Sequence, residues 1–435
     1  MNLSTFKQDL LASVVVFLVA LPLCLGIAIA SGLPPAAGLI TGIIGGIVAG
    51  SLSGSPLQVS GPAAGLAVLV YEIVQTQGLT SLAVIVMLAG LIQVGAGLLK
   101  AGQVFRAISP SVVYGMLAGI GVLILGAQVH VMVDGKPREN GLANILAIPE
   151  SIGKALFPVE GSSFHLAAYV GIGTIAILVL WARFAPPSLK WMPGALVAVV
   201  VSTVASAVMA LPIKYVELSD NFFGAIQILP FGQLPQIING EIILLAFTVA
   251  FVASAETLLS AAAVDQMHNG PRANYNKELI SQGVGNTLCG IVGSLPMTGV
   301  IVRSATNVAA GAKTRLSAIL HGVCLLALVV AAPKLLRMIP TASLAAILVY
   351  TGYKLVNIQN MKRLLRYGGA PIVIYAATLI GIVATDLLKG ILIGLALSML
   401  KVIYARTHFQ MRTEQANGGR RHDPAGEPRG HRVRR

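Results

Sequence analysis

The chain has 435 residues, of which 56% are hydrophobic and only 11% are charged, and its mean hydropathy is +0.83. These values exclude a soluble globular domain of this length and predict an all-α polytopic membrane protein. The formal net charge of +14 raises the question of an anionic partner.

Apolar stretches long enough to cross a bilayer as helices recur from about position 10 to about position 405. The first stretch leads directly into further spans, so we interpret it as a retained span and not as a signal peptide. We predict about 14 transmembrane segments: 10–30, 35–53, 61–75, 80–99, 110–133, 165–184, 192–212, 240–263, 278–292, 303–311, 316–332, 340–356, 370–386 and 389–405.

Two of these segments, the third and the tenth, are too short to cross the bilayer alone. Each follows a stretch that opens with Gly-Ser and contains proline and glycine: GSPLQVSGPAAGL at 54–66 and GSLPMTGVIVRSATN at 293–307. They occupy the third position of the first seven segments and the third position of the second seven. Because seven is odd, two such repeats must be inverted relative to each other.

Two broken helices that meet from opposite sides would turn their N-termini toward one cavity. Each N-terminus carries roughly half a positive charge and free backbone N–H groups, so the cavity would select anions. The alternative is a pair of tolerated kinks that pack against neighbouring helices. Gln58 and the hydroxyl groups beside the breaks favour the site.

Charged side chains inside the spans are rare because each is costly at the bilayer centre. Glu256 and Arg303 alone look central. Ser260 follows Glu256 by one helical turn and shares its face. We predict Glu256 as the proton or cation site and Arg303 as a source of positive potential; an ion pair that locks two helices together is the alternative.

Lysine and arginine concentrate in the short loops that lie inside if the N-terminus is inside. We therefore expect a multi-pass protein of the inner (plasma) membrane with both termini cytoplasmic. The polar segment 407–435 is expected to be a disordered basic cytoplasmic tail. Anionic membrane lipid is a better partner for that tail than nucleic acid, for which nothing else in the sequence argues.

The run from Ser254 to Val323 resembles the core of the SulP (sulfate permease) family of anion transporters, the relatives of prestin and pendrin. The family pattern places a carboxylate before S-L-L-S, then V-A-D, N-x-E-L-x-x-Q-G-x-x-N, G-x-x-G and R-[ST]-x-x-N-x-x-x-G-x-x-[ST]. The matching residues are Glu256, Leu258, Leu259, Ser260, Val264, Asp265, Asn276, Glu278, Leu279, Gln282, Gly283, Asn286, Gly290, Gly293, Arg303, Ser304, Asn307, Gly311 and Thr314. The segments ALPLCLGIAIASG, QVSGPAAG, ISPSVVYGMLAGIG and LLKGILIGLALSML extend the likeness to about 10–405.

This resemblance implies 14 segments in a 7+7 inverted repeat, with a core domain that moves against a gate domain in an elevator-like motion. The core would comprise 1–105 and 240–333, and the gate 106–213 and 334–406. A homodimer is expected. The anion would lie between the N-termini of the third and tenth segments, beside the carboxylate of the eighth; the residues we assign to it are Ser60, Gly61, Ala63, Gly299, Val302, Arg303 and Ser304, with Glu256 and Ser260 for the coupling ion.

Departures from the family pattern bear on coupling and regulation. Family members usually carry a C-terminal STAS domain, and here we expect its regulation to be absent or supplied by another chain. Leu23 after Pro22 is similar to the bicarbonate transporters of the family. Those sodium-coupled members pair an aspartate with a hydroxyl group, whereas this chain has Glu256 and, after Gly299, Val300 and Ile301. A sodium ion needs several oxygen ligands, so we favour proton coupling over sodium.

We predict a secondary transporter of inorganic anions that works by proton symport or anion exchange, without a cofactor or a metal site. Sodium-coupled bicarbonate uptake and an anion channel are the alternatives, and an anion-binding motor or sensor without turnover is a third. Cys24, Cys289 and Cys324 lie in apolar spans and suggest core packing. No Walker A motif and no nucleophile–base pattern occurs, so neither an ATP-driven pump nor an enzyme is expected. The sequence does not distinguish sulfate from bicarbonate, chloride or dicarboxylates.

Overall fold

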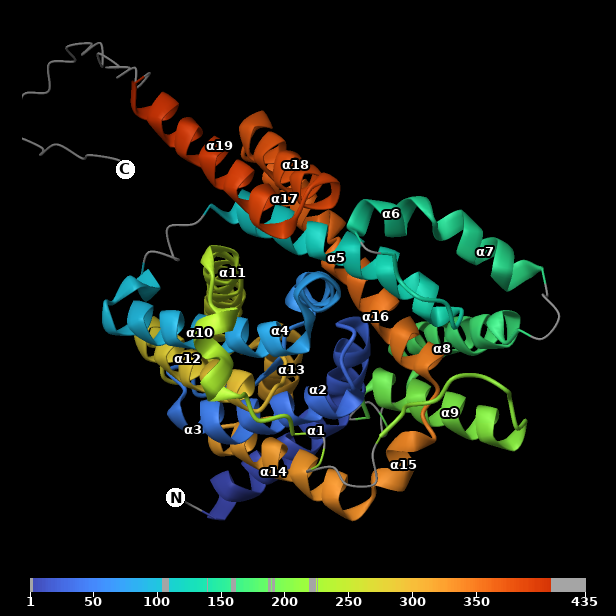
Figure 1. Ribbon diagram of the computed structural model, residues 1–435. Coiled ribbons are helices and arrows are strands. Elements are labelled where there is room, and N and C mark those ends of the chain that lie inside the picture. The colour runs from blue at the N-terminus through green and yellow to red at the C-terminus, as the bar shows by residue number, and fades with distance from the viewer. Residues whose placement is uncertain are drawn as a thin grey trace, which may run out of the picture.

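A computed structural model describes residues 3–103, 109–138, 140–157, 162–186, 189, 192–218, 224 and 226–407. These residues are mostly helical, and they contain one two-stranded sheet (Figure 1). The predicted tail 407–435 lies outside them except for Thr407.

The first half of the chain contains α1 (Leu3–Ala30), α2 (Pro35–Ile44), the π-helical turn η1 (Gly45–Ala49), α3 (Gly50–Leu52), β1 (Ser60–Pro62), the 3₁₀ turn η2 (Ala64–Leu66), α4 (Ala67–Leu98), α5 (Pro110–Met132), α6 (Gly141–Leu146), α7 (Ile148–Leu156), α8 (Phe164–Phe184) and α9 (Gly194–Val208). The second half contains η6 (Phe231–Gln233), α10 (Leu234–Ile237), α11 (Gly240–Asp265), α12 (Tyr275–Ile291), β2 (Met297–Gly299), α13 (Ile301–Ala309), α14 (Leu316–Ala331), α15 (Pro333–Arg337), α16 (Thr341–Leu355), α17 (Ile358–Leu365), α18 (Gly369–Ala384) and α19 (Leu387–Thr407).

Local sequence explains where many of these helices begin. Proline occupies the first position of α2 and α5, where its missing N–H is not needed. Asparagine side chains cap α6, α11, α12 and α17 by accepting a hydrogen bond from a backbone N–H of the first turn. Such caps determine the residue at which each helix begins, and therefore where the preceding loop ends.

Within the described residues, eight helices are long and apolar enough to span a membrane. Three further apolar helices, Gly194–Val208, Leu316–Ala331 and Gly369–Ala384, are shorter. The protein is therefore a multi-pass membrane protein. Every predicted segment contains helix, and the lower count arises because α4 joins two predicted segments and several others are short.

Gly78 is the joint within α4, and its φ of +78° departs from the helix around it. A side chain at this angle is strained, although nothing lies within 4 Å of the position that its Cβ would occupy. We expect Gly78→Ala to lower the free energy of unfolding by about 1–2 kcal/mol, and therefore to lower the thermal unfolding midpoint in detergent. Gly95→Ala, equally open but helical, should leave the midpoint unchanged or raise it. Equal midpoints for the two variants would contradict a strained joint at Gly78.

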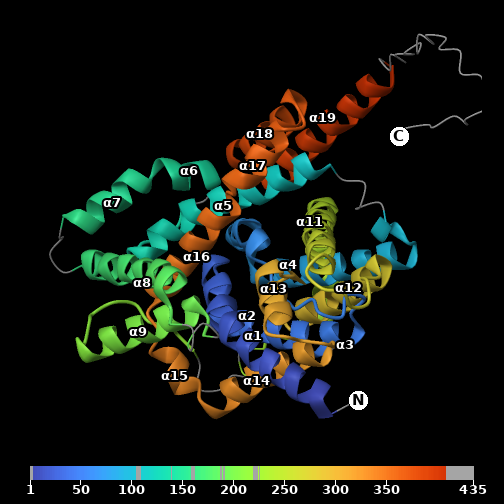
Figure 2. The same cartoon turned by 180° about the vertical axis from the view of Figure 1, so that it is seen from behind.

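The helices pack in two groups, which both views of the ribbon show (Figures 1 and 2). In one group α4 packs against α11 and α12, and α1 packs against α2 and α14. In the other, α5 packs against α16 and α18, α8 against α9 and α16, and α18 against α19. The groups touch through α1 with α16 and α9, and through α4 with α5.

Candidate functional site

The two broken helices meet in a short antiparallel sheet. Strand β1 pairs with β2 in the register Ser60 with Gly299, Gly61 with Thr298 and Pro62 with Met297. Two further hydrogen bonds continue the pairing, from Val300 N to the Val59 carbonyl at 2.9 Å and from Ala63 N to the Pro296 carbonyl at 3.3 Å. Non-helical backbone inside a membrane protein must satisfy its polar groups internally, and here each break satisfies the other.

The helices that follow the two strands run toward opposite ends of α1. Tyr71, early in α4, packs against Gly32 beyond the C-terminal end of α1. Ala309 and Ala310, at the end of α13, share a cleft with Leu11 near the N-terminal end of α1. The first turns of both helices therefore begin beside the same strand pair and diverge from it.

Polar side chains of α11 and α12 hold this strand pair in place. The Thr257 hydroxyl accepts a hydrogen bond from Gly299 N at 3.1 Å, and its carbonyl accepts one from the Gln58 amide at 3.1 Å. Asn286 bonds the backbone of Met297 in both directions. Nothing in the sequence singles out Thr257, and Asn286 stands out there only as a match to the family pattern.

Ser60 and Ser304 are both buried, and each bonds a protein partner. The Ser60 hydroxyl accepts a hydrogen bond of 2.6 Å from the Gln282 amide. The Ser304 hydroxyl accepts one of 2.9 Å from Val59 N and donates one of 2.7 Å to the Val300 carbonyl. Ser304 thus connects the extended segment before one broken helix with the first turn of the other.

Arg303 is fully buried at the first turn of α13, with 0% of its surface exposed. None of its three guanidinium nitrogens has a hydrogen-bond partner in the described part of the chain. The guanidinium lies against Gly61, where a Cβ would overlap Nη1. An unpaired cation at this depth is costly, and a bound anion would compensate it.

Glu256 lies across the strand pair, against the start of the other broken helix. A Cβ on Gly65 would lie 2.9 Å from its Oε2 and 3.0 Å from its Oε1. Oε2 is buried and has no hydrogen-bond partner among the described residues. No ion pair joins Glu256 to Arg303, so the alternative of a structural pair is not what the structure forms. Ser260, one turn further along α11, is buried.

The remaining assigned residues differ in exposure. Gly299 is buried at the end of β2, and Ala63 is buried directly after β1, whereas Val302 is 47% exposed. Thr306 and Ala309 continue along α13 into a cleft of about 890 Å³ between α1, α13 and the α8–α9 corner. One side of α13 therefore faces open space from the break to the end of the helix.

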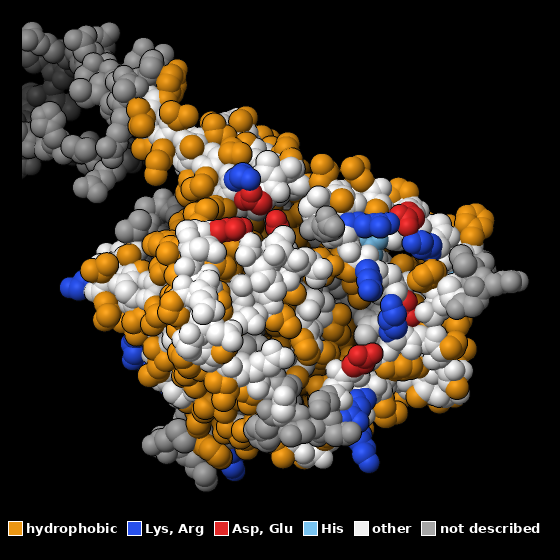
Figure 3. Space-filling model, in the orientation of Figure 1, with side chains coloured by type: hydrophobic (Ala, Val, Ile, Leu, Met, Phe, Trp, Pro, Cys, Tyr) orange, Lys and Arg blue, Asp and Glu red, His pale blue; other side chains and the backbone are white. Residues whose placement is uncertain are grey.

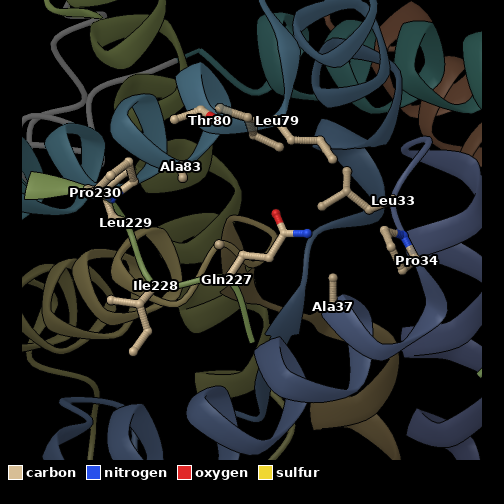
Figure 4. Close-up of a pocket in the computed structure, with 12 residues that line it drawn as sticks. Leu33, Pro34, Ala37, Leu79, Thr80, Ala83, Gln227, Ile228, Leu229 and Pro230 are labelled. Atoms are coloured by element: carbon tan, nitrogen blue, oxygen red, sulfur yellow. The ribbon is translucent and has the colours of Figure 1, made fainter. Parts of the chain in front are cut away.

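A separate cavity of about 160 Å³ lies near the Gly78 joint, where the Gln227 amide points inward between Leu33, Ala37 and Leu79 (Figure 4). It lies toward the C-terminal end of α1, and none of the assigned site residues lines it. The described residues contain no group of three or more His, Cys, Asp or Glu placed to bind a metal ion.

The contact between Gly61 and Arg303 allows a test that keeps the arginine. We expect Gly61→Ala to displace the guanidinium, because the added methyl group overlaps Nη1, and to weaken anion binding by about tenfold. Calorimetric titration with sulfate and with bicarbonate measures this. Gly173→Ala, at an open helical position, is the control and should bind as the wild type does. Unaltered affinity in Gly61→Ala would show that the guanidinium position is not important for binding.

The chain matches the model of the sulfate permease family over residues 6–378. It is 32% identical over 406 residues to a Bacillus subtilis protein named "Putative sulfate transporter YvdB", covering 92% of this chain and 74% of that protein. It is 28% identical to the bicarbonate transporter BicA of Synechocystis, covering 91% of this chain and 70% of BicA. The solved transmembrane domain of a cyanobacterial BicA superposes with a TM-score of 0.76 at 25% identity, covering 90% of this chain and 98% of that domain.

Proposed function

The chain belongs to the sulfate permease family, and we propose that it carries a small inorganic anion across the membrane by alternating access. The observation that carries this proposal is Arg303, a buried guanidinium without a protein partner at the first turn of a half-helix. Helix N–H groups, the helix dipole and a guanidinium all favour an anion at the same place. Sulfate or bicarbonate is the substrate class that the relatives' names support.

The anion site that we propose comprises the strand pair and the helix starts beside it. Arg303 supplies the charge, Gly61 leaves room for it, and the first-turn N–H groups of α13 have no capping side chain. Ser60, Ala63 and Gly299 shape the site through backbone pairing, and Ser304 does so through the hydrogen bonds of its hydroxyl group. Val302 borders the open side.

We further propose that the two packing groups move against each other as an elevator. The core group would be 1–105 and 240–333 and the gate group 106–213 and 334–406, arranged as 14 segments in a 7+7 inverted repeat. The strand pair belongs wholly to the core group, so the site would travel with it. The large cleft beside α13 and the small cavity beside the first turns of α4 are consistent with a site open toward one side only.

Glu256 provides the coupling in this proposal. An anion near Gly61 and Arg303 would lie close to a carboxylate that occupies the start of the partner half-helix, and the two negative charges repel each other. A proton on Glu256 removes that repulsion. Anion and proton therefore bind cooperatively, which is the thermodynamic requirement for symport.

Proteoliposomes that contain the full chain test the proposal. We would measure uptake of labelled sulfate and of labelled bicarbonate with a proton gradient, with a sodium gradient and with neither. Accumulation driven by protons supports symport, accumulation driven by sodium supports the sodium-coupled alternative, and flux that only equilibrates supports a channel. Binding without flux would contradict transport. Oligomeric state in detergent tests the expected homodimer.

A further inference from the structure

A small cavity separates the two packing groups at the end of the molecule away from the N-terminus of α1. It encloses about 40 Å³, which is room for about two or three water molecules. Its core side is one face of the broken helix, formed by Gly65, Val68, Leu69 and Glu72 at helical spacing. Its gate side comes from α5, the start of α6 and the turn between α18 and α19.

Gly65 lines this cavity at its inner end and also lies against the Glu256 carboxylate, so the cavity ends one residue away from Glu256. Its outer end is formed by Glu72 and Asp386, about 10 Å away because seven residues make about two helical turns. Oε2 of Glu256, buried and without a partner among the described residues, lies behind that inner wall.

The mouth of the cavity is acidic. Glu72 and Asp386 line it from opposite groups and are close enough to interact electrostatically. Lys389 pairs with Asp386 at 2.8 Å. Glu241, at the start of α11, accepts a hydrogen bond from Gln77, five residues further along the chain than Glu72. The space-filling view shows acidic side chains gathered beside one basic side chain below the place of the α18–α19 pair in Figure 1 (Figure 3).

An acidic mouth is unexpected in a chain of net charge +14 that we propose to carry anions. Two carboxylates line the mouth, and the one lysine beside them, Lys389, is paired with Asp386 and does not line the cavity; this arrangement repels an anion and attracts a cation. Of the other charges on this side, Arg138 is paired with Glu150, and Lys136 is exposed and does not line the cavity.

We propose that this cavity, closed here by Glu72 and Asp386, is the route by which the coupling cation reaches Glu256 ahead of the anion. The inference rests on the proposed function. When the core and gate groups separate at this end, the carboxylates concentrate cations at the mouth. Glu256 then binds a proton or cation first, and the anion enters a site whose repulsive charge has already been neutralised.

The charge preference of the mouth can be tested by chemical labelling, without a measurement of transport. We would introduce Val68→Cys, which faces the cavity, and label it from outside with a cationic and an anionic methanethiosulfonate reagent of similar size. Because the closed cavity is too small for either reagent, labelling reports the opened mouth. We expect the cationic reagent to react about tenfold faster. Adding Glu72→Gln with Asp386→Asn should remove most of this ratio. Equal rates in the Val68→Cys protein would overturn the proposal. Leu69→Cys gives a second position.

Transport of labelled sulfate provides the second arm. In the Glu72→Gln/Asp386→Asn double variant we expect proton-driven uptake to require a several-fold higher external proton concentration, while sulfate-for-sulfate exchange at equal pH should be retained or become faster, because the repulsion of the anion at the mouth is removed. Glu150→Gln is the control, since Glu150 is an exposed carboxylate away from the cavity, and hydrogen bonds from Lys154 and Arg138 lower its pKa so that it stays charged. An external pH profile that matches the wild type would overturn the route. Absence of all exchange in the wild type would instead overturn the proposed function itself.

Discussion

Replacing Arg303 with alanine is expected to weaken anion binding by about tenfold to a hundredfold while leaving the protein folded. The guanidinium is the unpaired buried cation nearest the start of α13, and hydrogen bonds to a charged group contribute about 1.5–3 kcal/mol. Removing it also removes an uncompensated charge from the protein interior, so stability should not fall greatly. Titration calorimetry with sulfate and bicarbonate and a thermal unfolding scan provide the two readouts.

Two further substitutions make this result specific. Arg303→Lys keeps the charge but loses the planar fork that binds two oxygens of one anion, so we expect an intermediate affinity. Arg363→Ala removes an exposed arginine of α17 and should bind as the wild type does. If Arg303→Ala binds sulfate and bicarbonate with unchanged affinity, the guanidinium has a structural role and the anion site lies elsewhere.

Much of the strand-pair region could be predicted because its signals are local. Proline and glycine in apolar surroundings mark where helix must stop, and their matched positions in the two halves indicate that the breaks are related. The helix starts follow from proline and asparagine at the caps. The structure adds that the segments before both half-helices pair as strands.

The partners of the polar groups could not be predicted, because they depend on tertiary packing. Ser304 was predicted as a residue of the anion site, and the structure shows its hydroxyl bonded to Val59 and Val300. Glu256 and Arg303 could have formed an ion pair on sequence grounds, yet each contacts a different glycine of the first break. The role of Thr257 could not be predicted either, because its hydroxyl group gains its partner, Gly299 N, only when β2 packs against α11.

Short helices in the loops also escaped prediction. Two of them, α6 and α7, lie in the predicted loop 134–164, and α17 lies between two predicted spans. Each has nine residues or fewer, so its apolar pattern is too short to distinguish from a loop. The Glu72–Asp386 mouth joins residues more than 300 positions apart and has no sequence signal of its own.

The substitution with the most diagnostic effect on coupling is Glu256→Gln. Glutamine has the shape of the protonated carboxyl group but does not release a proton, so the variant should hold the anion at any pH. We expect the wild type to gain about tenfold in apparent anion affinity on external acidification, a coupling of about 1.4 kcal/mol, and the variant to gain nothing. Accumulation against a gradient should be lost with it.

Exchange of one anion for another distinguishes this outcome from simple damage. Exchange needs the anion site and the motion of the core, but it needs no net proton transfer, so Glu256→Gln should retain it. Glu217→Gln, an exposed loop carboxylate, should keep both exchange and pH-driven uptake. Uptake at several external pH values in proteoliposomes compares all three proteins. If wild type and Glu256→Gln give the same pH profile, Glu256 is not the coupling site. Something other than a proton would then relieve the repulsion between anion and carboxylate, so sodium coupling or plain exchange would become the stronger interpretation.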